Sequence, residues 1–187
     1  MTLRIIAGKF KGHRLKTPGG LLTRPTQGVV REAIFNICQD RVHNARFLDL
    51  FAGSGAMGFE ALSRGALHVT LIENHRSAIA CIKQNITSLH AASQVTLLAT
   101  SARIALEKVG SIFDLVYIDP PYDLVTDELL AILLTRQLLA PSALLFVEER
   151  YIPKKPPTPF HSLQLMHKNS RRFGATLLHE YQKSEVL

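Results

Sequence analysis

The stretch VYIDPPYD, residues 116 to 123, places an acid, two prolines and an aromatic residue directly after a short apolar run. Asp119 and the carbonyl of Pro120 are two acceptors that suit the two N–H groups of an exocyclic amine on a nucleobase. The lone pair of such an amine is delocalised into the ring, and two acceptors can turn it toward an electrophile and stabilise the charge that develops. Pro120 and Pro121 hold the backbone and offer no competing N–H, and Tyr122 offers a face for an extruded base. An Asp-Pro pair also opens ordinary turns, but with its neighbours it predicts amine chemistry with Asp119, Pro120, Pro121 and Tyr122 as catalytic residues.

A glycine loop precedes this stretch. The sequence from Gly53 to Gly58 reads G-x-G-x-x-G, and Glu73 follows Gly53 by twenty residues. This is the spacing of a dinucleotide fingerprint, in which glycines allow close approach of the backbone and the acid binds ribose hydroxyls. The loop alone does not separate NAD from S-adenosylmethionine (SAM). Asp49 favours SAM, because a carboxylate before the loop attracts an ammonium group and repels a pyrophosphate.

Apolar and amphipathic segments alternate from residue 46 onward, which predicts the elements that position these residues. We expect strands over 46–51, 68–73, 95–100, 113–119 and 143–149, with helices over 56–65, 77–90, 101–110 and 127–139. Two further strands, antiparallel, follow near the C-terminus. The pattern predicts an α/β fold, Rossmann-like, with a mostly parallel sheet covered on both faces. Ligands of such sheets bind at the carboxyl ends of the strands, so the loop and Asp119 should meet there.

Positive charge is concentrated at the start of the chain. Residues 1–46 contain nine Lys and Arg against two acids, whereas the remaining residues are balanced at 13 each. This asymmetry predicts contact with a polyanion, nucleic acid first and an anionic membrane second. We therefore expect a basic N-terminal extension over 1–45, made of a hairpin and a helix, followed by one catalytic domain over 46–187.

Other features narrow the class of protein. The 47% hydrophobic and 20% charged content is ordinary for a globular chain. We expect a cytoplasmic protein that does not span a membrane, because the N-terminus has no apolar signal region and the longest apolar run is interrupted. The histidines and the two cysteines show no metal-ligand spacing, so no metal site is expected.

The motif DPPY together with DLFAGSG looks like the amino-methyltransferases of the SAM-dependent class I fold. The stretches RIIAGKFKGHRLKTP, TRPTQGVVREAIFN, DLFAGSGAMGFEALSRGA and GATLLHEYQ extend the match over nearly the whole chain. They resemble the bacterial small-subunit ribosomal RNA guanine-N2 methyltransferase family of RsmD type. The resemblance implies methyl transfer from SAM to a guanine of that RNA, within the 30S subunit or an assembly intermediate.

The resemblance also implies roles for individual residues. The cofactor-binding set comprises Asp49, Phe51, Gly53, Ser54, Gly55, Glu73, Asn74 and Ser101. Ser101 stands where the family usually has Asp or Asn, and Gly28 and Val29 depart from the family pattern in the segment before the loop. The RNA-binding set comprises Lys9, Lys11, Arg14, Arg24 and Arg31.

Three alternatives remain open on the sequence. A DNA adenine-N6 methyltransferase uses the same motif pair, although 187 residues leave little room for a target-recognition region. An NAD-dependent oxidoreductase follows from reading the glycine loop literally. A non-enzymatic RNA-binding module follows from the charge alone.

Overall fold

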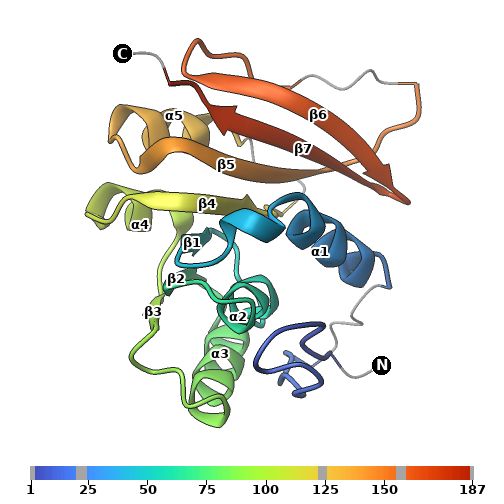
Figure 1. Ribbon diagram of the computed structural model, residues 1–187, viewed down its shortest axis with the longest axis vertical. Helices are drawn as coiled ribbons and strands as arrows, with labels where there is room; N and C mark the ends of the chain where they lie inside the picture. Colours follow the sequence, from blue (N-terminus) through green and yellow to red (C-terminus); the bar gives the residue numbers. More distant parts are fainter. Residues whose placement is uncertain (1–2, 20–24, 122–125, 155–158, 186–187) are drawn as a thin grey trace.

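The computed structural model describes residues 3–19, 25–121, 126–154 and 159–185, and only the backbone of residues 25–27. These residues form a seven-stranded sheet in the order β3-β2-β1-β4-β5-β7-β6 (Figure 1). The strands are β1 (Arg46–Asp49), β2 (His68–Ile72), β3 (Val95–Leu98), β4 (Phe113–Ile118), β5 (Leu139–Arg150), β6 (Leu165–Phe173) and β7 (Thr176–Lys183). The first five strands run parallel and β7 is antiparallel to both of its neighbours. The predicted α/β fold with a mostly parallel sheet is confirmed.

Helices precede and connect the parallel strands. They are α1 (Pro25–Ile37), a short 3-10 turn η1 (Gln39–Arg41), α2 (Ala56–Ser63), α3 (Arg76–Ser88), α4 (Ala102–Lys108) and α5 (Asp127–Thr135). The crossover from β3 through α4 to β4, which lies beside β1, makes β1 and β4 the point where the strand order reverses. A cleft at the carboxyl ends of these two strands is where such folds bind ligands.

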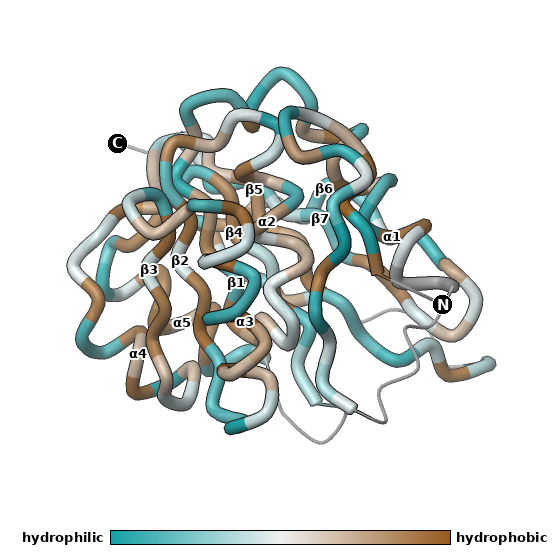
Figure 2. Tube along the Cα trace, turned by 90° about the horizontal axis from the view of Figure 1, so that it is seen from below, coloured by the Kyte–Doolittle hydropathy of each residue, from teal (hydrophilic) through white to brown (hydrophobic). Residues whose placement is uncertain are grey.

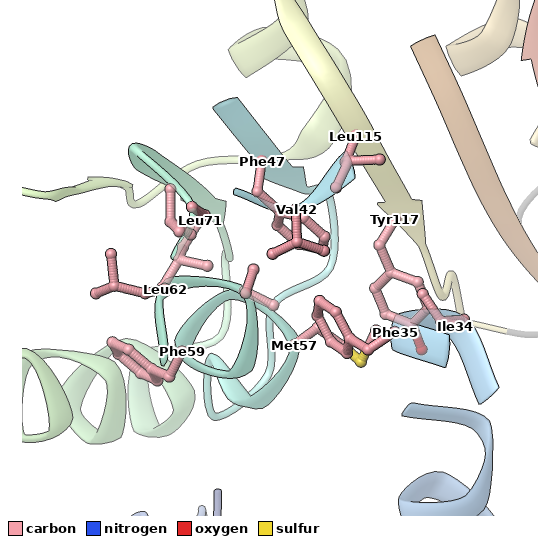
Figure 3. Packing of buried hydrophobic residues seen from close by; sticks show 14 of the residues in the cluster. Ile34, Phe35, Val42, Phe47, Met57, Phe59, Leu62, Leu71, Leu115 and Tyr117 are labelled. Atoms are coloured by element: carbon pink, nitrogen blue, oxygen red, sulfur yellow. The ribbon is translucent and has the colours of Figure 1, made fainter. Parts of the chain in front are cut away.

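The core has one cluster on each face of the sheet, because successive strand residues point to opposite faces. In β1, Phe47 joins a cluster with α1, α2 and α3, while Leu48 joins a cluster with α4 and α5. Figure 3 shows the first cluster, with Phe47 beside Val42 and Leu71 facing α2. Hydrophobic residues accordingly follow the strands, and many outer loops are hydrophilic (Figure 2).

The N-terminal segment packs onto the domain that it precedes. Its two arms are antiparallel around one isolated bridge between Arg4 and Arg14, so the predicted hairpin exists without regular strands. Ile5 and Leu15 are buried in the same cluster as residues of α2. Gly8 approaches α2 so closely that a Cβ would lie 1.9 Å from the carbonyl oxygen of Ser63, so only glycine fits there.

One predicted boundary is wrong. The helix expected to reach Leu139 ends at Thr135, because Gln137 turns with φ 54° and Leu139 already pairs with Phe113 as the start of β5. Within the described ranges, no helix combines the length and apolar character needed to cross a membrane. The same residues contain no cluster of His, Cys, Asp or Glu that could hold a metal ion.

Candidate functional site

A pocket lies at the carboxyl ends of β1 and β4, where Asp49 pairs in register with Tyr117. Its volume is about 140 Å³. Among the residues predicted for a site, the pocket brings together Asp49, Phe51, Gly53, Ser54, Asp119 and Arg31. Leu3, Thr17, Pro18, Met57 and Tyr117 also line it and were not predicted. One wall of the pocket therefore comes from the N-terminal segment.

The three glycines of the loop have different tasks. Gly53 has φ 55° and no described atom within 4 Å of where a Cβ would stand, so its backbone faces open space. At Gly55, with φ 80°, a Cβ would lie 2.5 Å from the Phe59 ring, and at Gly58 it would lie 2.4 Å from Leu71. Gly53 thus leaves room for a ligand, while Gly55 and Gly58 let α2 pack against the sheet.

Glu73, at the end of β2, holds this loop in place. Its Oε2 accepts a hydrogen bond from the Gly53 N–H at 2.7 Å, and its Oε1 accepts from the N–H groups of Asn74 and His75, both at 2.8 Å. A carboxylate has about four acceptor positions, so one remains for a ribose hydroxyl. The predicted ribose-binding role of Glu73 stays a prediction, and so does the predicted cofactor contact of Asn74.

Four residues of the predicted cofactor-binding set are not among those that line the pocket: Gly55, Glu73, Asn74 and Ser101. Ser101 follows β3 at the N-cap of α4, half-buried, and its side chain makes no capping hydrogen bond. Its predicted contact with the adenine of the cofactor stays a prediction.

Asp49 is buried, with 1% of its surface exposed, yet its Oδ1 has no hydrogen-bond partner among the described residues. The N–H of Phe51 donates to the carboxylate. Burial raises the pKa of Asp49 well above its usual range, and the nearby charges of Asp119, Glu73 and Glu148 raise it further. A carboxyl in these surroundings favours a cationic ligand, which would restore its missing partner.

A second acid lies behind the pocket wall. The Tyr117 hydroxyl donates a hydrogen bond to Oε1 of Glu148, and both side chains are buried. Burial, followed by the charge of Asp119, raises the pKa of Glu148 to about 7. Tyr117 also belongs to the hydrophobic core, as its place in an apolar run indicates (Figure 3). Glu148 was not predicted for the site, although an acid within the apolar run of β5 was a signal of a buried carboxylate.

Asp119 follows directly after β4 and lines the pocket. Pro120 is half-buried and Pro121 is exposed. The acid therefore shares the pocket with Asp49 of the neighbouring strand, whereas neither proline is among the residues that line it. Tyr122 lies outside the described residues, and so does Arg24.

The residues predicted to bind RNA divide into two groups. Lys9, Lys11 and Arg14 are exposed. Arg31 is only 5% exposed and lines the pocket, and its predicted contact with RNA stays a prediction. Its Nη2 donates to the carbonyl of Arg4 at 2.9 Å, and its Nε lies 3.7 Å from Oε2 of the buried Glu60.

Comparisons with known proteins place this site in context. The family model described as Conserved hypothetical protein 95 matches residues 3–182. Ribosomal RNA small subunit methyltransferase D of Escherichia coli K12 is 35% identical, over 84% of this chain and 79% of its own. The protein of that name from Haemophilus influenzae is 34% identical over 78% of each chain. A solved structure, putative methyltransferase yhhF from E. coli, has a TM-score of 0.86 and 33% identity and covers both chains completely. The chain therefore belongs to the Conserved hypothetical protein 95 family, the RsmD family, as its sequence motifs indicated.

Proposed function

We propose that this protein transfers the methyl group of SAM to the exocyclic N2 amine of a guanine in small-subunit ribosomal RNA. The observation that carries the proposal is the shared pocket of Asp119, Asp49 and the glycine loop at the ends of β4 and β1. Its relatives named ribosomal RNA small subunit methyltransferase D support the RNA class. The guanine and its N2 atom follow from the resemblance to the RsmD family.

The pocket residues fit SAM as the cofactor. Asp49 lines the cavity and has a buried carboxylate oxygen without a partner among the described residues, and the backbone at Gly53 faces open space. An ammonium group would supply the missing partner, and an adenosine-bearing molecule needs a loop that its atoms can approach. When bound, SAM supplies a methyl group that its sulfonium has already activated. The chain's own contribution is then position and electrostatics.

Asp119 and Pro120 orient the guanine amine. The Asp119 carboxylate accepts one N–H of the amine and the Pro120 carbonyl accepts the other, so the nitrogen lone pair turns toward the methyl group. The carboxylate also stabilises the positive charge that forms on the nitrogen and is the nearest acceptor for the proton that the amine then loses. Tyr122 remains the predicted stacking surface for the base.

The basic extension supplies the contact with RNA. Lys9, Lys11 and Arg14 are exposed on a segment that also reaches the pocket through Leu3 and Thr17. Cations on this segment would bind phosphates near the nucleotide that enters the pocket. We propose the 30S subunit or its assembly intermediate as the natural substrate.

The test is a methyl-transfer assay with labelled SAM and small ribosomal subunits that lack the modification, followed by mass spectrometry of the nucleosides. We expect label in N2-methylguanosine. Label in N6-methyladenine of DNA, offered in a parallel reaction, would instead favour the adenine methyltransferase. Protein-free RNA as a third substrate shows whether the subunit is required.

A further inference from the structure

Two residues of opposite charge that line the pocket each have a buried polar atom without a hydrogen-bond partner among the described residues. Across the described residues, only Arg31 Nε and Asp49 Oδ1 are buried side-chain nitrogen or oxygen atoms without a hydrogen-bond partner. Both residues line the same cavity. A buried polar atom without a partner costs about 1–3 kcal/mol, so such atoms are rare in folded proteins. Two of them at one cavity indicate a ligand that carries both a positive and a negative group.

The Arg31 guanidinium has N–H groups that could donate hydrogen bonds to a ligand. A guanidinium has five N–H donors, and among the described residues this one donates one hydrogen bond, to the carbonyl of Arg4. The 3.7 Å between its Nε and Glu60 is an ion-pair distance and too long for a hydrogen bond. Glu60 is already occupied by the N–H groups of Ile6 and Ala7 and by Arg64. Burial lowers the pKa of Arg31, which an anionic ligand would counteract.

The Arg31 guanidinium and the Asp49 carboxylate together indicate which part of a ligand binds between them. A planar guanidinium matches a carboxylate, and the Asp49 carboxylate matches an ammonium group. A molecule with both groups on one carbon atom is an α-amino acid. The amino-acid end of SAM has this form, so the inference rests on the cofactor assigned under the proposed function.

We propose that Arg31 binds the α-carboxylate of the cofactor, opposite Asp49 at its ammonium. The cofactor site is then shared between the two predicted parts of the chain, because Arg31 belongs to α1 of the N-terminal extension and Asp49 to β1. Arg31 also holds Arg4 in the basic hairpin. Cofactor binding therefore fixes the extension against the domain before RNA is bound.

The test compares two ligands by titration calorimetry: S-adenosylhomocysteine (SAH) and its decarboxylated analogue, which keeps the amine. The variant Arg31→Met keeps the length of the side chain and removes its donors. We expect the wild type to prefer SAH about 10- to 100-fold, which is typical of one charge-assisted contact. In Arg31→Met the affinity for SAH should fall by that factor, while the affinity for the analogue stays within about threefold.

Arg64→Met is the matched control, because Arg64 pairs with the same Glu60 at 2.8 Å but does not line the pocket. We expect it to bind both ligands as the wild type does. Equal weakening of both ligands in Arg31→Met would assign Arg31 a purely structural role and overturn the inference. Unchanged SAH affinity, with RNA binding reduced, would overturn it in favour of an RNA contact.

Two further outcomes are decisive. If Arg31→Met does not fold by circular dichroism, Arg31→Lys replaces it, and a loss confined to SAH is again expected. A wild type that binds SAH and its analogue equally overturns the role of Arg31 and leaves the proposed function intact. A wild type that binds neither ligand overturns the proposed function itself.

Discussion

Two acids of this protein are almost completely buried, and their surroundings are opposite. Glu60 is 0% exposed, and its carboxylate accepts hydrogen bonds from Ile6 N at 2.8 Å, Ala7 N at 3.0 Å and Arg64 Nε at 2.8 Å. Asp49 is 1% exposed, has one unpartnered oxygen and faces further carboxylates. A buried charge is stable only when it is paired and hydrogen-bonded.

The different surroundings of these two acids indicate that Glu60 has a structural role and that Asp49 has a role in ligand binding. Glu60 is satisfied by the protein itself and fastens the N-terminal segment to α2. Asp49 is not satisfied, and its neighbours Asp119 and Glu148 are charges of the same sign. The hydrogen bonds of Glu60 stabilise the folded protein. One carboxylate oxygen of Asp49 lacks such a partner among the described residues, so its favourable contact forms only when a ligand binds. Substitutions at both acids and at their neighbours test this contrast.

The largest effect is expected at Asp119. Asp119→Ala should lower turnover about 10²- to 10⁴-fold, because it removes the carboxylate that orients the amine and stabilises its charge. SAH affinity should stay within a few-fold of the wild type. Single-turnover methyl transfer and calorimetry on the same sample measure both quantities, and near-normal turnover would remove Asp119 from the mechanism.

Glu60→Gln should be the most destabilising of these substitutions. It leaves the Arg64 and Arg31 cations without a buried anion, for which about 3 kcal/mol of unfolding free energy is expected to be lost. Glu107→Gln is the control, since its ion pair with Arg103 is exposed and should contribute below about 1 kcal/mol. Urea unfolding measures both variants. Equal losses would mean that Glu60 is not the structural acid of the pair.

Glu148 should make stability depend on pH. Its pKa rises from 4.5 to about 7 on folding, so the folded state holds a proton that the unfolded state has lost. The free energy of unfolding should therefore fall as pH rises from about 4.5 to 7, by about 1–3 kcal/mol from this group. The groups that face it are Tyr117, Asp119 and Asp49.

Glu148→Gln should remove this part of the pH dependence and stabilise the unliganded protein above pH 7. Urea unfolding at a series of pH values measures it. Asp49 stays in place in this variant, so any remaining slope in the same direction is assigned to Asp49. A slope identical to that of the wild type would show that Glu148 is ionised throughout.

The smallest effect is expected for RNA affinity, at the exposed lysines of the N-terminal segment that Glu60 holds against α2. Lys9→Gln with Lys11→Gln should reduce the slope of log affinity for RNA against log salt concentration by about 0.7–0.9 for each phosphate that the protein no longer neutralises. Arg103→Gln with Lys108→Gln, two exposed cations on α4, is the control and should leave the slope unchanged. Filter binding at several salt concentrations distinguishes them. Equal slopes for both pairs would place the RNA elsewhere.

Much of this organisation follows from local sequence. The apolar strands and the loop from Gly53 to Gly58 predict the sheet and the cleft, because each depends on near neighbours in the chain. The basic start of the chain likewise predicts the exposure of Lys9 and Lys11. The family is confirmed by its relatives, whereas the individual site residues remain predictions.

The remainder depends on contacts between distant residues. Arg31 is one cation among many in a basic segment, and only its approach to Glu60 and Asp49 in three dimensions sets it apart. Glu148 acquires its raised pKa from burial and then from the charge of Asp119, which follows the neighbouring strand β4. The end of α5 at Thr135 depends on the pairing of Leu139 with Phe113. The periodicity of hydrophobic residues along the chain does not show which distant residues come into contact.

Proton release on SAH binding is the most direct test of the contrast between Asp49 and Glu60. Burial raises the pKa of Asp49 in the free protein, and an ammonium ligand opposes that shift. At a pH where Asp49 is protonated in the free protein, binding should therefore release protons. Calorimetry in buffers of different ionisation enthalpy measures the number. We expect release in the wild type and its loss in Asp49→Asn, together with weaker SAH binding and an unliganded protein that is no less stable. Undiminished binding without any proton release, in a variant that unfolds more easily, would show that Asp49 is a structural acid like Glu60.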